Sequence, residues 1–361
     1  MTGGGGEGGI RVLLAAHQSL ALGGIGTMAR GLAQHLPEAI DSHGTVFVAM
    51  PKRGGRLSRR LGALGGPGAA ARLWHEQVRL ARIAGEFDLV HLCDLRPLAL
   101  TRTPFLITVH DVDFLDRPQW LPASARLYKT RMLAAALRKR PAAIVCVSEH
   151  TRRRLLHHFP DAARIELRVI HPGVEQPAPR WTGTGEPPFF LTVSTIHPRK
   201  NHLGLLRAYR EARRRGLELR WLVAGPPGPR SREIRRVLAA EPGASVLGAV
   251  KPDELDRLYR EATFVATPSA LEGFGYPPLE AMARGTPTLS SNAASLPEIV
   301  GDAGPLLPPD DVAAWARALA WLAGDAEARR ELSEKGPERA ARFSWQRSAE
   351  SVVRLYREVC G

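Results

Sequence analysis

The chain has 361 residues, enough for about two domains, and its 44% hydrophobic content suits a globular protein with sizeable cores. Its three cysteines lack the paired spacing of a disulfide framework or a zinc site, and no apolar run is long enough to span a bilayer, so we expect a cytoplasmic protein. The net charge is +14, of which +10 lies in residues 1–175. The basic first half would attract phosphate groups, anionic lipid or nucleic acid, or it is only a solvated, arginine-rich surface.

The first half alternates short apolar runs with helical patterns. Residues 1–9 form a polar, glycine-rich start that we expect to be disordered, and 51–68 form a basic, glycine-rich loop. A helix is expected over 27–36 and another after Ser148, a good N-cap. Buried strands are predicted at 10–16, 44–50, 87–92, 105–111, 142–148 and 167–174. Apolar strands separated by helices predict a parallel sheet covered on both faces.

The same pattern restarts after a linker over 177–188 that is rich in proline, glycine and threonine. Strands are predicted at 189–194, 219–225, 244–250, 263–269 and 286–292. Helices are predicted at 203–216, 253–262, 277–285 and 311–324, and the segments after 324 are predicted to be helical as well. We therefore predict an α/β protein with two doubly wound, Rossmann-like domains, 10–176 and 189–343, which face a cleft and bind ligands at the carboxyl ends of strands.

The segment LEGFGYPPLEAMARG carries two glutamates, Glu272 and Glu280, around a glycine-rich turn and a helix start. Carboxylates accept hydrogen bonds from hydroxyl groups, and a helix N-terminus favours a phosphate. Hydroxyls and phosphate in one small site indicate a sugar nucleotide. A pair of solvated glutamates, or an acid–base couple like that of glycoside hydrolases, are the alternatives.

Other candidate residues follow predicted strands. Gly24 lies in a glycine turn that would let a phosphate approach the backbone, although the spacing is not that of a dinucleotide fingerprint. His110 ends a strand, where it would bind a hydroxyl or be structural. Arg199 and Lys200 suit a diphosphate or form a surface basic pair, with Asn201 as a helix cap. Asp111 and Asp113 form the one D-x-D sequence, which is a weak metal motif.

Taken together, these motifs resemble the retaining GT-B glycosyltransferases of the glycogen-synthase-like and mannosyltransferase-like group (glycosyl transferases group 1). The resemblance runs from GGIGTMARGL through FLITVHD, VSEHTRRRL, VIHPGV and VSTIHPRKN, and is densest over 268–304. It implies that a final helix, 344–359, crosses back onto the N-terminal, acceptor-side domain. It also implies that 189–343 binds the nucleotide sugar.

The resemblance also implies roles for single residues. Three side chains would act in transfer: His110 and Glu272 on the transferred sugar and Lys200 on the diphosphate. The donor would also be bound by Gly24, Arg199, the amides of Phe274 and Gly275, and Glu280, which would hold the ribose. Many relatives carry an arginine where this chain has Ser194, which leaves more of the phosphate charge to Lys200, Arg199 and the helix terminus.

The implied reaction moves a hexosyl group, mannosyl-like or deoxyhexosyl-like, from a nucleoside diphosphate to a glycan, lipid-linked or small-molecule acceptor with retention. It needs no protein nucleophile, no metal and no other cofactor. A basic helical segment at 126–140 would contact anionic lipid at the inner face of the membrane, or be an ordinary domain helix. The alternatives are a same-fold epimerase or phosphorylase, or a protein that binds phosphate or nucleic acid through its basic half; we expect no specific nucleic acid partner.

Overall fold

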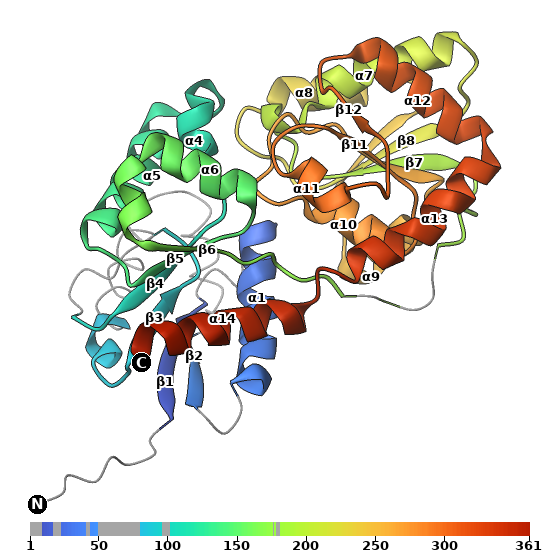
Figure 1. Cartoon of the computed structure of the whole chain (residues 1–361). Coiled ribbons are helices and arrows are strands. Elements are labelled where there is room, and N and C mark those ends of the chain that lie inside the picture. Colours follow the sequence, from blue (N-terminus) through green and yellow to red (C-terminus); the bar gives the residue numbers. More distant parts are fainter. Residues whose placement is uncertain are drawn as a thin grey trace, which may run out of the picture.

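In the computed structural model the chain forms two lobes, each built around a parallel β-sheet (Figure 1). The structure describes residues 9–16, 23–40, 44–49, 80–95, 102–175, 177 and 181–361. Residues 1–8 of the glycine-rich start, the basic loop at 51–68 and residues 178–180 of the expected linker lie outside these ranges. The predicted fold, two doubly wound α/β domains, is confirmed.

The N-terminal sheet has six parallel strands in the order β2-β1-β3-β4-β5-β6. All six strands were predicted; the central ones are apolar runs buried on the sheet, whereas the edge strands β2 and β6 are only partly buried. The middle strands β3, β4 and β5 are buried at every position. The strands are β1 Ile10–Ala15, β2 Gly44–Ala49, β3 Leu89–Leu92, β4 Phe105–Val109, β5 Ala143–Cys146 and β6 Glu166–Val169.

Helices connect the strands of this sheet, as the alternation of apolar runs and helical patterns predicted. Ser148 caps α6 as predicted, since its Oγ accepts a hydrogen bond from the amide of Thr151 at 3.1 Å. The basic segment lies in α5, where Leu127 and Tyr128 are exposed; its contact with lipid stays a prediction. The helical elements are α1 Gly24–Ala39, α4 Asp113–Asp116, η2 Pro118–Trp120, α5 Ala123–Arg138, α6 Glu149–His158 and η3 Pro160–Arg164. Throughout the described ranges, every helix is too short or too polar to cross a lipid bilayer.

The second sheet also has six parallel strands, in the order β12-β11-β10-β7-β8-β9. Five were predicted. The sixth, β12, was missed because two residues are too few to show an apolar pattern. The strands are β7 Phe189–Val193, β8 Arg220–Ala224, β9 Ala244–Gly248, β10 Phe264–Thr267, β11 Thr288–Ser291 and β12 Leu306–Leu307.

The helices of the second domain include two that the sequence did not predict, α8 and α11. They have eight and five residues, which is too short for a clear helical period. The helical elements are η4 Pro198–Lys200, α7 His202–Arg214, α8 Arg232–Ala239, α9 Pro252–Glu261, α10 Tyr276–Ala283, α11 Leu296–Val300, α12 Val312–Gly324 and α13 Ala326–Ala340.

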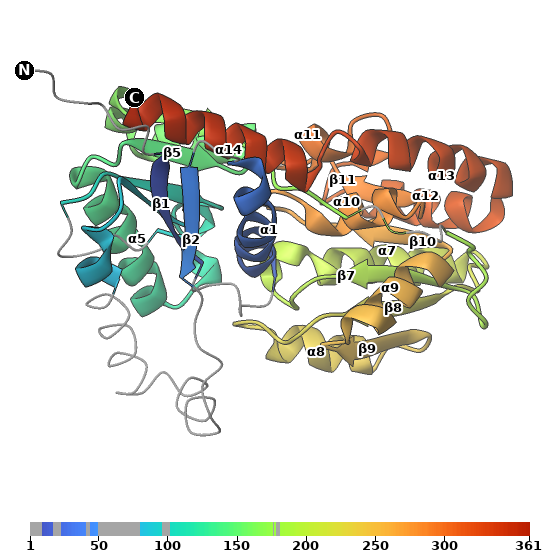
Figure 2. The ribbon, with the colours of Figure 1, turned by 90° about the horizontal axis from the view of Figure 1, so that it is seen from below.

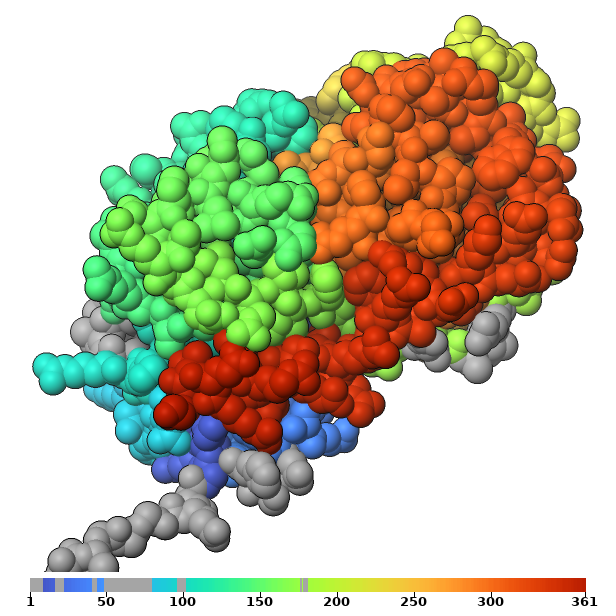
Figure 3. Space-filling view, in the orientation of Figure 1, coloured from blue at the N-terminus to red at the C-terminus, as the bar shows by residue number. Residues whose placement is uncertain are grey.

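The last helix, α14 (Trp345–Cys360), leaves the second lobe and packs on α1 of the first (Figure 2). A Cβ atom on Gly31 of α1 would overlap the indole ring of Trp345, so glycine permits the close approach. Deeper in the same interface, the ring of buried His91 contacts the hydroxyl of Tyr356 at 2.7 Å. The space-filling view shows this red helix lying along the blue-to-green lobe (Figure 3). The two domains are therefore connected twice, by the chain before β7 and by α14.

Candidate functional site

The strand order of the second sheet reverses at the pair β7 and β10. Ligands of doubly wound sheets bind beside such a point, at the carboxyl ends of the strands. Lys200 follows β7 and Glu272 follows β10. The fold thus brings together two predicted site residues that are 72 positions apart in the sequence.

Lys200 and Glu272 form a buried ion pair, with only 7% and 5% of their surfaces exposed. The Lys200 ammonium donates a hydrogen bond to Oε1 of Glu272 at 2.5 Å, and the Ser269 hydroxyl donates to the same oxygen at 2.7 Å. A guanidinium nitrogen of Arg199 lies 3.7 Å from the other oxygen. Two cations and a hydroxyl therefore surround one carboxylate.

The two cations of this cluster hold Glu272 in its ionised form. Burial acts to raise the pKa of Glu272, but the charges of Lys200 and Arg199 outweigh it and hold that pKa below its usual value. Burial lowers the pKa of Lys200, and the nearby carboxylate of Glu272 opposes this effect. Removing Lys200 would leave the buried Glu272 carboxylate with only the more distant Arg199, and removing Glu272 would leave Lys200 without the carboxylate that it contacts.

The glycine-rich turn after Glu272 leads into α10 as expected, but this helix offers few free donors. Its N-cap is Gly275, whose φ of 124° favours glycine. Pro277 and Pro278 occupy the second and third helical positions and have no N–H group. The helix dipole is present, yet hydrogen bonds to a phosphate must come from the peptide groups of the turn itself. The two prolines are visible in the sequence, but the prediction that this helix N-terminus binds a phosphate did not take their missing N–H groups into account.

A serine at the N-cap position of α11 holds that turn from one side. The Ser295 hydroxyl contacts the carbonyl oxygens of Glu272 at 3.0 Å and Phe274 at 2.5 Å. The Phe274 ring is buried and packs against Tyr276 and Phe343. Neither Ser269 nor Ser295 was among the predicted site residues, since a lone serine in a loop carries no distinctive sequence signal.

His110 reaches the site from the N-terminal domain. Its Nε2 lies 2.9 Å from the carbonyl oxygen of Cys93, which can only accept, so Nε2 carries the proton and Nδ1 is left as an acceptor. Burial lowers the pKa of His110, which favours the neutral ring. The ring borders a cavity of about 240 Å³ in the N-terminal domain. The cavity is lined by Ile25, Asp94, Leu95, His110, Asp111, Tyr128, Lys129 and Met132.

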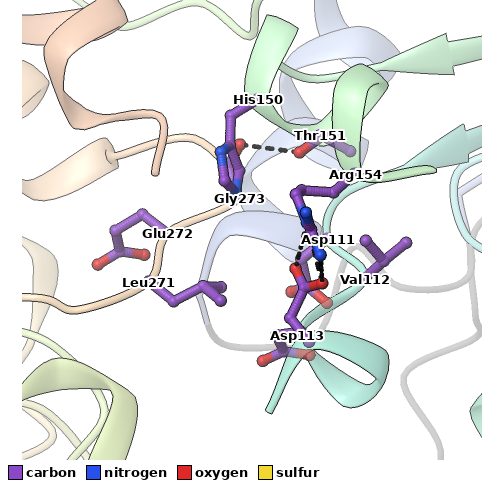
Figure 4. A pocket seen from close by; sticks show the side chains of 10 residues that line it. Asp111, Val112, Asp113, His150, Thr151, Arg154, Leu271, Glu272 and Gly273 are labelled. Carbon is purple, nitrogen blue, oxygen red and sulfur yellow. Dashed lines mark hydrogen bonds and ion pairs between the residues drawn. The ribbon is translucent and has the colours of Figure 1, made fainter. Parts of the chain in front are cut away.

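The two aspartates that follow His110 lie beside the ion pair. Asp113 Oδ2 is 3.8 Å from the Arg199 guanidinium, and Lys129 lies 3.8 Å from Asp113 and 3.9 Å from Asp111. Burial, together with the charge of Asp111, raises the pKa of Asp113 to about 7. Figure 4 shows both aspartates in a crevice with Glu272 and the first turn of α6. Within the described ranges, no three histidine, cysteine or carboxylate groups come together as a metal site requires.

Two further predicted residues lie at α10: Glu280 is within the helix, and Gly24 lies against its first residue, Tyr276. The Tyr259 hydroxyl donates to Oε2 of Glu280 at 2.7 Å, and burial raises the pKa of this carboxyl group. Gly24 begins α1, and a Cβ atom there would lie 3.1 Å from the ring of Tyr276. The glycine turn of the first domain thus meets the start of α10.

Ser194 and Asn201, which precede and follow Lys200 in the chain, both bind partners in the second domain. Ser194 lies where the family resemblance implied an arginine, and its hydroxyl contacts the buried ring of His202 at 3.1 Å. The prediction of Asn201 as a helix cap is correct in position only, because its side chain makes no capping hydrogen bond. Asn201 occupies the N-cap position of α7, but its side chain donates instead to the carbonyl oxygen of Pro309 at 2.6 Å, which ties η4 to a loop beyond β12.

Two family models match this chain, one in each domain. Glycosyltransferase Family 4 matches residues 22–176, and Glycosyl transferases group 1 matches residues 179–339. Together the two matches span most of the chain. They contain every residue predicted to bind or transfer a sugar.

Curated relatives agree with these matches. The chain is 29% identical over 272 residues to O-antigen chain mannosyltransferase B of Escherichia coli, covering 69% of each protein. It is 36% identical over 224 residues to D-inositol 3-phosphate glycosyltransferase of Saccharomonospora viridis, covering 57% of this chain and 52% of that enzyme. The chain thus spans only about half the length of this second relative.

Solved structures share the fold over nearly the whole chain. Sucrose-phosphate synthase from Thermosynechococcus elongatus aligns with a TM-score of 0.71 at 19% identity, over 97% of this chain and 98% of that one. HepE of Anabaena, solved with UDP and glucose, aligns with a TM-score of 0.73 at 16% identity, over 97% and 100%. At these identities the likeness concerns the fold alone. With the family models it leads to one conclusion: the chain carries a Glycosyltransferase Family 4 domain followed by a Glycosyl transferases group 1 domain, and it has the GT-B fold.

Proposed function

We propose that this protein transfers a hexosyl group from a nucleoside-diphosphate sugar to a hydroxyl of a glycan, lipid-linked or small-molecule acceptor, with retention of the anomeric configuration. One observation carries the proposal. The buried Lys200–Glu272 pair lies at the strand-order reversal, beside the dipole end of α10. Cations and a carboxylate, placed there together, suit a diphosphate and the hydroxyls of its sugar.

The negatively charged diphosphate of the donor would be bound by the cations of the site. Lys200 has three N–H groups and Glu272 uses one of them, so the ammonium still has donors for a diphosphate oxygen. Arg199 lies next to it and adds a second cation. These cations stabilise the negative charge that develops on the leaving diphosphate, which is the main electrostatic task of the reaction.

The hydroxyl groups of the donor would meet acceptors on both domains. Tyr259 occupies Oε2 of Glu280, so Oε1 faces the ribose hydroxyls. The unprotonated Nδ1 of His110 accepts from a hydroxyl of the transferred sugar. No side chain is assigned as a covalent nucleophile: the acceptor hydroxyl attacks the anomeric carbon from the face of the departing diphosphate, the bond from that carbon to the diphosphate breaks, and a diphosphate oxygen takes the proton of the hydroxyl. Independence from metals and other cofactors is part of this proposal.

The relatives support a donor of this class without fixing its base. One is a mannosyltransferase, and HepE has been solved with UDP-glucose. A thermal-shift series with UDP, GDP and dTDP, each alone and as its sugar, should raise the melting temperature with one base more than with the others, because binding stabilises the folded state by mass action.

The reaction itself is tested with the sugar nucleotide selected in that series. Transfer to an acceptor, with the product's anomeric configuration read by NMR, should show retention. Epimerised donor without transfer would indicate an epimerase, and turnover that needs inorganic phosphate would indicate a phosphorylase. The proposal fails if no nucleotide shifts the melting temperature and no sugar nucleotide is consumed. Chelator should leave the rate unchanged.

A further inference from the structure

The first turn of α6, in the N-terminal domain, contacts the turn that follows Glu272 in the second domain. The Ser148 hydroxyl donates to the carbonyl oxygen of Gly273 at 2.6 Å. The Thr151 hydroxyl lies 3.2 Å from the same oxygen, a contact drawn in Figure 4. Both side chains are buried, with 0% and 1% of their surfaces exposed. Two hydroxyls of one domain thus hold one carbonyl group of the other.

This contact is separate from the capping of α6. A hydroxyl has one donor hydrogen and two acceptor lone pairs, so Ser148 accepts from the Thr151 amide while it donates to Gly273. Capping needs only the acceptor, and the contact with Gly273 needs only the hydrogen. The two roles can therefore be removed separately.

Holding the Gly273 carbonyl fixes the direction of the next amide. The C=O and N–H of a trans peptide point in opposite directions, so a carbonyl oxygen held toward α6 points the Phe274 N–H away from α6. Ser295 holds the carbonyl oxygens of Glu272 and Phe274, which fixes the peptide groups before and after. Among the described residues, no acceptor is recorded for the Phe274 amide. Because Pro277 and Pro278 have no N–H, this amide is one of the few donors that the turn has for a ligand.

A carboxylate keeps the two domains in this arrangement. Glu298 of α11 accepts from the Glu149 amide of α6 at 2.9 Å and contacts the His171 ring at 2.6 Å. A carboxylate at the first turn of a helix is favourable, because free amides and the helix dipole point at it. The turn is therefore enclosed between α6 and α11, and Glu298 joins these two helices.

We propose that Ser148 and Thr151 are positioning residues that direct the Phe274 amide toward the donor's sugar or diphosphate oxygens, so that the donor site is complete only when the two domains are closed. This inference rests on the proposed function, because it assumes that the turn binds the donor. It assigns the N-terminal domain a role in donor binding through a peptide group of the other domain.

The test uses variants that lose the hydroxyl that contacts Gly273 at little cost to the helix. Ser148→Gly keeps most of the capping energy, since glycine is a fair N-cap, and Thr151→Val keeps the shape of the side chain. Each should lower kcat/KM for the sugar nucleotide by roughly fivefold, the ratio that corresponds to one hydrogen bond. The loss should appear mainly in the donor's KM and not in that of the acceptor. Ser148→Thr and Thr151→Ser keep a hydroxyl and should recover most of the activity.

Ser344→Gly is the matched control, because Ser344 caps α14 by accepting from the Arg347 amide in the same way. Hydrogen–deuterium exchange of the peptide over 271–275 gives a readout without turnover. Exchange should be faster in Ser148→Gly and Thr151→Val but unchanged in Ser344→Gly. The inference is overturned if the wild type transfers sugar and both variants behave like the control, or if exchange over 271–275 does not change. A wild type that consumes no donor contradicts the proposed function, and the exchange experiment still decides the positioning role.

Discussion

The Lys200–Glu272 pair shows how one contact can serve both folding and chemistry. The two ions are buried and 2.5 Å apart, so each lowers the cost of burying the other. The same ammonium is the strongest candidate for binding the diphosphate. A simple loss of activity in a Lys200 variant would therefore not separate the two roles.

We predict that Lys200→Met destabilises the protein by about 3–5 kcal/mol, because it leaves a buried carboxylate with only the more distant Arg199. The double variant Lys200→Met/Glu272→Leu should recover most of that stability but none of the activity. Urea unfolding and donor turnover measure the two effects. Lys335→Met, at an exposed position of α13, is the control. Equal stability of Lys200→Met and the control would contradict the structural role of the pair.

Asp113 should make stability depend on pH near neutrality. Burial and the charge of Asp111 raise its pKa to about 7 in the folded protein. The folded state thus binds a proton that the unfolded state releases at lower pH, and this contribution to stability is present in acid and lost as the pH rises toward 7 and above. Asp113→Asn imitates the protonated form. It should be more stable than the wild type at pH 8, with a difference that shrinks toward pH 4; parallel unfolding curves across this range would contradict the assignment.

Among the elements, the short helices and turns decide the site more than the long helices do. The strands and α6 were predicted because apolar runs and an N-cap are local signals. The five-residue α11 was not predicted, yet Ser295 lies at its N-cap position and Glu298 lies within it. Both act on partners far away in the sequence, so no local pattern indicates them. The packing of α14 on α1 was implied by family resemblance alone.

That helix packing can be tested at Gly31. Gly→Ala inside a helix normally stabilises by about 1 kcal/mol, but a Cβ atom on Gly31 would overlap the Trp345 ring. We therefore predict the opposite sign for Gly31→Ala, a loss of about 1–3 kcal/mol from overpacking. Gly324→Ala, where a Cβ atom meets nothing within 4 Å, should cost nothing. Denaturant unfolding of the two variants compares them, and a stabilised Gly31→Ala would show that α14 does not pack this closely.

At the scale of the whole molecule, the two domains touch through backbone as well as side chains. A Cβ atom on Gly273 would overlap the carbonyl oxygen of His110, so the approach of the second domain to the end of β4 depends on a glycine. The contact brings the sugar-binding candidates of both domains together. A side chain added at Gly273 should therefore increase the distance between the two domains.

We predict that Gly273→Ala holds the domains apart and lowers transfer on the order of 100-fold, the usual effect of about 1 Å of misplacement. Each domain keeps its own core, so the melting temperature should change little. Small-angle scattering should report a larger radius of gyration than in the wild type or in Gly324→Ala. An unchanged radius together with full activity would mean that His110 and Gly273 do not meet in the active protein.

The sequence by itself determined the two-domain α/β fold and the positions of eleven of the twelve observed strands, because burial on a parallel sheet leaves apolar runs that can be read locally. It also singled out Lys200, Glu272, Glu280 and His110 as candidates that follow strands or begin a helix. Only the tertiary structure decided that Lys200 and Glu272 form an ion pair, that His110 keeps its proton on Nε2, and that Ser148, Thr151 and Ser295 hold the turn between Glu272 and α10. The reason is physical: these contacts join residues that lie far apart in the chain and depend on the directions of single hydrogen bonds, which a residue type alone does not specify.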